Sequence, residues 1–149
     1  MTSNREIKSK KIVLASDHAG FNLKEKIKKF LLNKGRKILD LGTNNTNSVD
    51  YPDYAHLLSK KINKNNNFFG VLVCGSGEGM NMAANKHKNV RAALCYSLKT
   101  AKLSREHNNA NVIAIGARLT NHNLALKCVN TFIKTNFKGG RHLKRIKKI

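Results

Sequence analysis

A cysteine followed by three alternate glycines is the stretch of the sequence best suited to do chemistry. An apolar run over 70–74 ends in Cys74, the next five residues read GSGEG, and a segment of small, helix-forming residues follows over 80–86. A buried strand that turns on glycines into a helix directs backbone N–H groups towards the strand's carboxyl end, where they favour an anion. We expect the helix N-terminus to lower the pKa of Cys74, whose thiolate could then be a nucleophile or a general base. The alternative is a small buried core residue.

The glycine segment departs from three familiar anion-binding motifs. Met80 occupies the sixth position of G-x-G-x-x-G, and the first acidic residue after Glu78 is Glu106, too far along the chain for a dinucleotide fingerprint. No Lys-Ser or Lys-Thr pair follows the glycines, as a P-loop requires. The arginine of a cysteine phosphatase loop, six residues after Cys74, is also replaced by Met80. A tight turn without a ligand remains the alternative to an anion site of another kind.

Other polar residues with chemical potential follow predicted strands or lie near the end of the chain. Asp17-His18 comes directly after the first apolar run, and His107 lies in a polar segment before the fifth. Arg141 and Arg145 are four residues apart, so on a helix they would share one face and suit a phosphate. The alternatives are ordinary solvent-facing loops and a solvated basic terminus.

Short apolar segments that alternate with amphipathic ones predict the elements that position these residues. We expect strands over 12–16, 37–41, 70–74, 91–96 and 111–117, and helices after each of them. Asn22 has the spacing of a helix N-cap, Gly35 ends that helix, Ser97 caps a later one and Thr120 opens the last. The pattern predicts an α/β doubly wound domain over 1–149 with one parallel sheet, followed within it by a basic tail at 139–149.

In such a sheet, ligands bind beyond the carboxyl ends of the strands. Asp17-His18, the segment 74–79 and Arg118 all follow predicted strands, so we expect them to meet at that edge. Cys95 and Cys128 lie in apolar segments and are predicted to be core residues. With three widely spaced cysteines and no CxxC pair, a zinc site is not expected.

The formal net charge of +21 calls for an explanation, because strongly basic proteins often bind nucleic acid. Lysines number 22 against 7 arginines, and 20 asparagines accompany them along the whole chain, which indicates compositional bias. A nucleic-acid-binding α/β module remains a lesser alternative, since no recognised motif and only 9 aromatic residues support it. Without an apolar leader or a membrane-length segment, we expect a cytoplasmic protein with no membrane partner.

Five segments in one order and spacing give the chain a specific resemblance to a known family. They are SDHAG at 16–20, DYPDYA at 50–55, GVLVCGSGEGMNMAANK at 70–86, LSREHNNANVIAIGAR at 103–118, and GGRH at 139–142 followed by Arg145. Together they resemble the type B ribose 5-phosphate isomerases, a family that includes the galactose 6-phosphate isomerase subunits. The similarity runs through nearly the whole chain.

The resemblance implies an α/β/α sandwich with a five-stranded, Rossmann-like parallel sheet. It implies a homodimer or a dimer of dimers whose active sites are shared between subunits. The implied reaction is the aldose–ketose isomerisation of ribose 5-phosphate and ribulose 5-phosphate in the pentose phosphate pathway, without a metal or organic cofactor. Six-carbon substrates, allose 6-phosphate or galactose 6-phosphate, are the alternative, because spacing does not identify the residues that set the depth of the pocket.

The same resemblance implies roles for particular residues. Cys74 would move the proton between C1 and C2, and Ser76 would help to handle hydroxyl protons. His107 would act in ring opening, with Asp17 close to the same sugar oxygens. The implied substrate-binding residues, some of them from a neighbouring subunit, are Asp17, His18, Gly75, Ser76, Gly77, Glu78, Gly79, Asn108, Arg118, Arg141 and Arg145.

Two positions test how far the resemblance extends. One subfamily uses a glutamate base late in the glycine segment, where this chain has Met80, so Cys74 is assigned as the base. Glu78 places a carboxylate in the same segment, and a negative charge directed inward would oppose thiolate formation. We therefore expect Glu78 to face solvent or to pair with a lysine. A catalytically inert partner subunit is disfavoured, because Cys74, His107, Arg141 and Arg145 all occur in one chain.

Overall fold

Five parallel strands form the centre of the structure, a computed structural model that describes residues 10–149. The strands are β1 (Lys11–Ser16), β2 (Ile38–Asp40), β3 (Phe68–Cys74), β4 (Ala92–Leu94) and β5 (Val112–Gly116). The helices are α2 (Phe21–Asn33), α3 (Tyr51–Lys64), α4 (Glu78–Ala84), α5 (Leu98–Asn108), α6 (His122–Lys134) and α7 (Arg141–Ile146). The order of strands is β2-β1-β3-β5-β4, which confirms the predicted parallel sheet.

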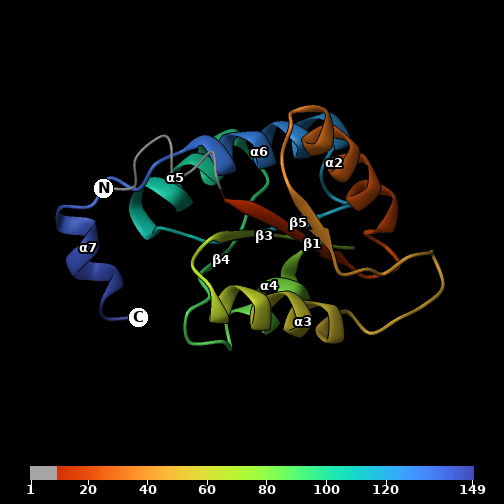
Figure 1. The fold of residues 1–149 in the computed structure, drawn as a ribbon, viewed down its shortest axis with the longest axis horizontal. Helices are drawn as coiled ribbons and strands as arrows, with labels where there is room; N and C mark the ends of the chain where they lie inside the picture. The colour runs from red at the N-terminus through yellow and green to blue at the C-terminus, as the bar shows by residue number, and fades with distance from the viewer. Residues whose placement is uncertain (1–9) are drawn as a thin grey trace.

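Helices cover both faces of the sheet, so the fold is the expected three-layer α/β/α sandwich (Figure 1). On one face, α2, α5 and α6 bury apolar side chains against alternate residues of the central strands, such as Ile12, Val71 and Ile113. On the other face, α3 and α4 cover the residues between them, such as Val13, Leu72 and Ala114. Because the strands are apolar on both sides, they read in the sequence as continuous apolar runs. Within residues 10–149, no helix is long and apolar enough to cross a bilayer.

Most helix boundaries follow local sequence, but two predicted starts are wrong. Ser97 caps α5 as expected, and its side chain forms a capping box with Thr100. Asn22 is not the cap of α2, because the helix begins at Phe21, two residues earlier than an Asn22 cap requires, and Gly20 holds the cap position without a side-chain bond. Thr120 does not open α6, since Asn121 accepts the N–H groups of the first turn instead. In both cases the apolar residues predict that a helix forms but leave its first residue uncertain by one or two positions, so the capping residue is misplaced.

The strand register brings the ends of β1, β3 and β5 to one edge of the sheet. Ser16 pairs with Val73, and Cys74 pairs with Gly116, the last residue of β5. Helix α5 then runs back from the carboxyl edge, where β4 ends, to the amino edge, where β5 begins. The short helix α7 lies at the amino-edge end of the molecule, beside α5 and away from the carboxyl edge (Figure 1).

Candidate active site

A cavity of about 320 Å³ opens at the carboxyl edge of the sheet, between the ends of β1, β3 and β5. It brings together six of the residues singled out from the sequence and two others. The lining residues are Asp17, Tyr51, Cys74, Gly75, Ser76, Gly79, Arg118 and Leu119. The expectation that the segments after three separate strands meet at this edge is therefore confirmed, as is common for ligand sites in parallel sheets.

Backbone hydrogen bonds fix the glycine segment against the end of β5. The N–H of Ala117 donates to the Cys74 carbonyl over 2.8 Å, and the N–H of Arg118 donates to the Gly75 carbonyl over 3.0 Å. A Cβ atom at Gly75 would lie 3.1 Å from Nη1 of Arg118, so the glycine lets the guanidinium lie directly over the segment. Gly77 has a φ of +81°, which residues with a side chain rarely adopt. A Cβ atom there would also clash with the side chain of Leu94.

Cys74 is 4% exposed and receives the backbone N–H of Gly77 at its Sγ atom, 3.2 Å away. Burial raises the pKa of Cys74 above its ordinary value, because a thiolate loses solvation there. The N–H groups of Met80, Gly77 and Ser76 act in the opposite direction, while the nearby Asp17 carboxylate raises the pKa further. The predicted net lowering of this pKa is wrong, because sequence position gives the helix N-terminus but not the depth of burial.

Asp17 and His18 are held in place by separate backbone groups. The buried Asp17 carboxylate accepts the N–H of Gly20 over 3.0 Å, which fixes its direction at the end of β1. His18 accepts the N–H of Val49 at Nδ1 over 3.2 Å, so the neutral ring carries its proton on Nε2. His18 is not among the residues that line the cavity, and the loop before α3 sets the orientation of its ring.

Glu78 is exposed at the first position of α4, as expected for a carboxylate that does not oppose the thiolate. Its N–H donates to Oγ of Ser76 over 3.2 Å. The N–H groups of Gly77 and Glu78 are thus directed at atoms of the segment itself. The carboxylate that acts on Cys74 is Asp17, which follows the neighbouring strand β1 and was expected at this edge of the sheet.

The remaining predicted site residues lie at the opposite edge of the sheet. His107 and Asn108 end α5 just before β5 begins, and Arg141 and Arg145 lie on α7, which packs beside α5. The four residue steps of β5 span about 13 Å at roughly 3.3 Å each, more than a histidine side chain can reach. Within one chain, these residues and the Cys74 cavity form two separate groups, here called the amino-edge group and the carboxyl-edge group.

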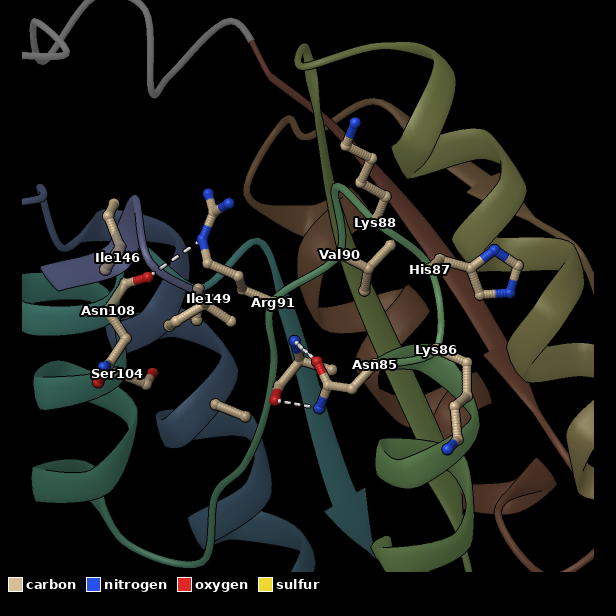
Figure 2. A pocket seen from close by; sticks show the side chains of 13 residues that line it. Asn85, Lys86, His87, Lys88, Val90, Arg91, Ser104, Asn108, Ile146 and Ile149 are labelled. Atoms are coloured by element: carbon tan, nitrogen blue, oxygen red, sulfur yellow. Dashed lines mark hydrogen bonds between the residues drawn. The ribbon is translucent and has the colours of Figure 1, made fainter. Parts of the chain in front are cut away.

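One residue of the amino-edge group, Asn108, lines a second, larger cavity of about 570 Å³ (Figure 2). Asn108 and Ile146 line it from α5 and α7, and Lys86 and Arg91 line it from the segments before β4. Nε of Arg91 donates to the carbonyl of Asn108 over 3.1 Å, which ties the end of α5 to the start of β4. Next to Asn108 in the chain, the ring of His107 stacks on that of His142 in α7, with centroids 4.3 Å apart and an interplanar angle of 9°.

Two residues of the carboxyl-edge cavity were not assigned from the sequence. The Tyr51 ring packs so closely on Gly79 that a Cβ atom there would lie 2.6 Å from it, and the side chain is 41% exposed. Leu119 follows Arg118 and is 75% exposed at the rim. Tyr51 falls inside one of the five family-like segments, which was the only available indication, whereas nothing in the local sequence marked Leu119.

The carboxyl-edge group combines a thiol, a carboxylate, a guanidinium and N–H groups at the start of a helix. Such a set can accept a proton from carbon and stabilise the negative charge that forms on a neighbouring oxygen. Among the described residues 10–149, no three His, Cys, Asp or Glu side chains are grouped so that they could hold a metal ion.

Comparisons with known proteins agree with these features. Residues 12–149 match the sequence model of the family described as Ribose/Galactose Isomerase. The ribose-5-phosphate isomerase B of Escherichia coli is 38% identical over 140 residues, which cover 94% of both chains. The crystal structure of a ribose 5-phosphate isomerase from Thermotoga maritima is 51% identical, with a TM-score of 0.90 and coverage of 93% of this chain and 95% of that one. The Mycoplasma genitalium ribose-5-phosphate isomerase B, solved with bound ribulose-5-phosphate, is 46% identical with a TM-score of 0.91 over 94% and 93% of the two chains.

Proposed function

The chain belongs to the ribose/galactose isomerase family, and from this premise we propose that the enzyme interconverts ribose 5-phosphate and ribulose 5-phosphate. The observation that carries the proposal is the carboxyl-edge cavity, where a nearly buried thiol meets Asp17, Arg118 and the start of α4. Relatives named as ribose 5-phosphate isomerases, one of them solved with ribulose-5-phosphate, support the choice of a five-carbon substrate.

Cys74 acts as the base in the proposed reaction. The thiolate takes the proton from C2 of the open-chain aldose, the C1 carbonyl becomes an enediolate oxygen, and the thiol returns the proton to C1. The hydroxyl proton on O2 leaves as the C2 carbonyl forms and is transferred to O1, which becomes the C1 hydroxyl, with Ser76 placed to relay it. A buried base with a raised pKa holds the proton well between the two carbons, because water does not compete for it.

Charge that develops on O1 and O2 needs donors close by. Arg118 lies over Gly75, and Gly79 in the first turn of α4 lines the same cavity. Of the N–H groups in and after the glycine segment, those of Ser76, Gly77 and Met80 already stabilise the Cys74 thiolate before the reaction, and that of Glu78 donates to Oγ of Ser76. We assign the enediolate to Arg118 and to the segment's other N–H groups.

A second copy of the chain completes the proposed active site. His107 opens the furanose ring, Asn108 bonds a sugar hydroxyl, and Arg141 and Arg145 bind the phosphate, yet all four lie in the amino-edge group. Since one chain holds the two groups at opposite edges of its sheet, the amino-edge group of one copy must meet the carboxyl-edge group of another. A symmetric homodimer with two shared sites satisfies this requirement.

The proposed function is tested by a coupled isomerase assay with ribose 5-phosphate, allose 6-phosphate and galactose 6-phosphate. We expect turnover to be highest with the five-carbon sugar phosphate. Cys74→Ala should lower turnover between about 10² and 10⁴-fold, the usual contribution of a positioned base, while calorimetry still detects substrate binding. Cys128→Ala, a buried cysteine on the other face of the sheet, is the matched control and should keep its turnover. Faster turnover of a six-carbon substrate would replace the proposed one.

A further inference from the structure

We propose that His142 is a positioning residue that holds the imidazole of His107 in the orientation needed for ring opening. This inference rests on the proposed function, in which His107 acts on the furanose oxygens. The two rings stack almost parallel, with centroids 4.3 Å apart and an angle of 9° between their planes. A flat neighbour in this arrangement restricts rotation of the His107 ring about its last side-chain bond but leaves the ring edge, where the nitrogens lie, open to a ligand.

The stack is supported by ties between the end of α5 and the segment that leads to α7. Glu106 accepts Nζ of Lys138 at a distance of 3.0 Å, and its carbonyl accepts the N–H of the same lysine over 3.1 Å. Nε of the buried Arg105 donates to the carbonyl of Thr135 over 3.1 Å. The two residues that precede His107 in helix α5 thus hold the chain that leads to His142. These bonds hold the segment before α7 against α5 and so keep the ring of His142 close to that of His107.

The charges around His142 favour a neutral ring. Burial against its neighbours lowers the pKa of His142, and His107, Arg141, Arg145 and Lys138 lower it further because all of them are or become positive. A neutral His142 ring can stack on the His107 ring without charge repulsion, whether His107 is neutral or protonated. Its own role is then steric, so an uncharged aromatic ring should replace it.

Ring opening requires two proton transfers with defined directions. The C1–O4 bond of the furanose breaks, O4 gains a proton, and the hydroxyl proton on O1 leaves as the C1 carbonyl forms. An imidazole that carries out one of these transfers must present its nitrogen within hydrogen-bonding reach and in line. Removal of the proton from C2 or C1 takes place afterwards at Cys74 and does not need this orientation.

The experiment separates the two steps with two substrates. Ribulose 5-phosphate cannot form a furanose because its O5 carries the phosphate, so loss of its C1 proton signal in D₂O reports only the proton transfer by Cys74. We expect His142→Ala to lower turnover of ribose 5-phosphate by about tenfold or more, as misplaced catalytic groups do, with exchange at C1 of ribulose 5-phosphate changed less than about threefold. His142→Phe should restore turnover of ribose 5-phosphate. Lys144→Ala, an exposed neighbour on α7, is the control and should behave as the unmodified chain.

Three outcomes would overturn the proposal. The first is His142→Ala with unchanged turnover of ribose 5-phosphate. The second is an equal loss in turnover and in exchange, which would mean that the substitution disturbs substrate binding as a whole. The third is a loss in His142→Phe as large as in His142→Ala, which would make His142 a proton-transfer group. An unmodified enzyme that neither converts ribose 5-phosphate nor exchanges ribulose 5-phosphate would instead overturn the proposed function on which the inference rests.

Discussion

Cys74 combines two environments that pull its acidity in opposite directions. Burial at the end of β3 raises its pKa, while backbone N–H groups from the start of α4 stabilise the thiolate. A base needs a pKa close to the working pH, so the balance between these effects decides how much of the enzyme is active at a given pH. The Asp17 carboxylate shifts that balance towards the thiol.

The pH dependence of turnover should therefore respond to Asp17. In the proposed reaction turnover needs the thiolate, so kcat/KM should rise with pH through the raised pKa of Cys74. Asp17→Asn removes a negative charge beside the thiol, which makes the thiolate easier to form, so the rising limb should move to lower pH whatever happens to the maximal rate. The measurement is a pH profile of kcat/KM with ribose 5-phosphate.

Glu78→Gln is the matched control for this prediction. It removes a carboxylate from the glycine segment itself, but one that is exposed on the outer side of α4. Its profile should coincide with that of the unmodified enzyme. A shift in Glu78→Gln together with no shift in Asp17→Asn would show that the carboxylate that acts on Cys74 has been identified wrongly.

Among the elements, α5 decides which residues can meet. It begins at Ser97 near the carboxyl edge and ends at Asn108 near the amino edge, so it carries His107 away from the cavity of its own chain. Its first turn is fixed by the Ser97–Thr100 capping box, in which each side chain bonds the other residue's backbone N–H. The start of α2 differs, because the residue at its cap position is Gly20, which has no side chain to accept an N–H of the first turn.

These two helix starts give opposite predictions for two alanine substitutions. Ser97→Ala should lower the free energy of unfolding by about 1 kcal/mol, because it leaves the N–H of Thr100 in the first turn of α5 without its acceptor. Asn22→Ala should leave it unchanged or raise it slightly, because Asn22 is an exposed residue inside α2, where alanine is the better helix former. Urea unfolding monitored by circular dichroism measures both. A larger loss in Asn22→Ala than in Ser97→Ala would contradict the assigned caps.

Local pattern predicted the elements well because each strand and helix buries its own apolar residues. All five strands, the core cysteines Cys95 and Cys128 and the Ser97 cap were predicted correctly. The burial and charge environment of single side chains, which depend on residues distant in the sequence, were not predicted. Lys24 looks like a solvent-facing residue in the sequence, yet its side chain is fully buried and its Nζ pairs with Asp40 at 2.8 Å. The raised pKa of Cys74 was missed for the same reason, since burial depends on the whole fold.

At the scale of the whole molecule, the sequence motifs form two halves of one proposed site. The crossover through α5 separates them by the length of the sheet, and no change of side-chain rotamer closes that gap. The motif residues could be listed from the sequence, but their division between the two edges required the topology. This division makes the subunit arrangement testable through activity alone.

Two inactive variants should restore activity to each other when they are assembled together. In a dimer of one Cys74→Ala chain with one His107→Ala chain, one shared site carries both defects and the other carries neither. Each mixed dimer has one intact site of two, so the fraction that carries both tags should recover about half of the activity of the unmodified enzyme. The two chains are co-expressed with different affinity tags, and the ribose 5-phosphate isomerase activity of the doubly tagged fraction is measured.

The control pairs Cys74→Ala with Asp17→Ala, two defects in the carboxyl-edge group. Every shared site of such a mixed dimer contains one of the defects, because each carboxyl-edge group comes from a single chain, so no activity should return. Recovery in the first pair but not in the second means that the site takes its two halves from different chains. An absence of recovery in the first pair, in mixed dimers whose formation is verified by the two tags, would instead place His107 and Cys74 in the same half and contradict the shared site.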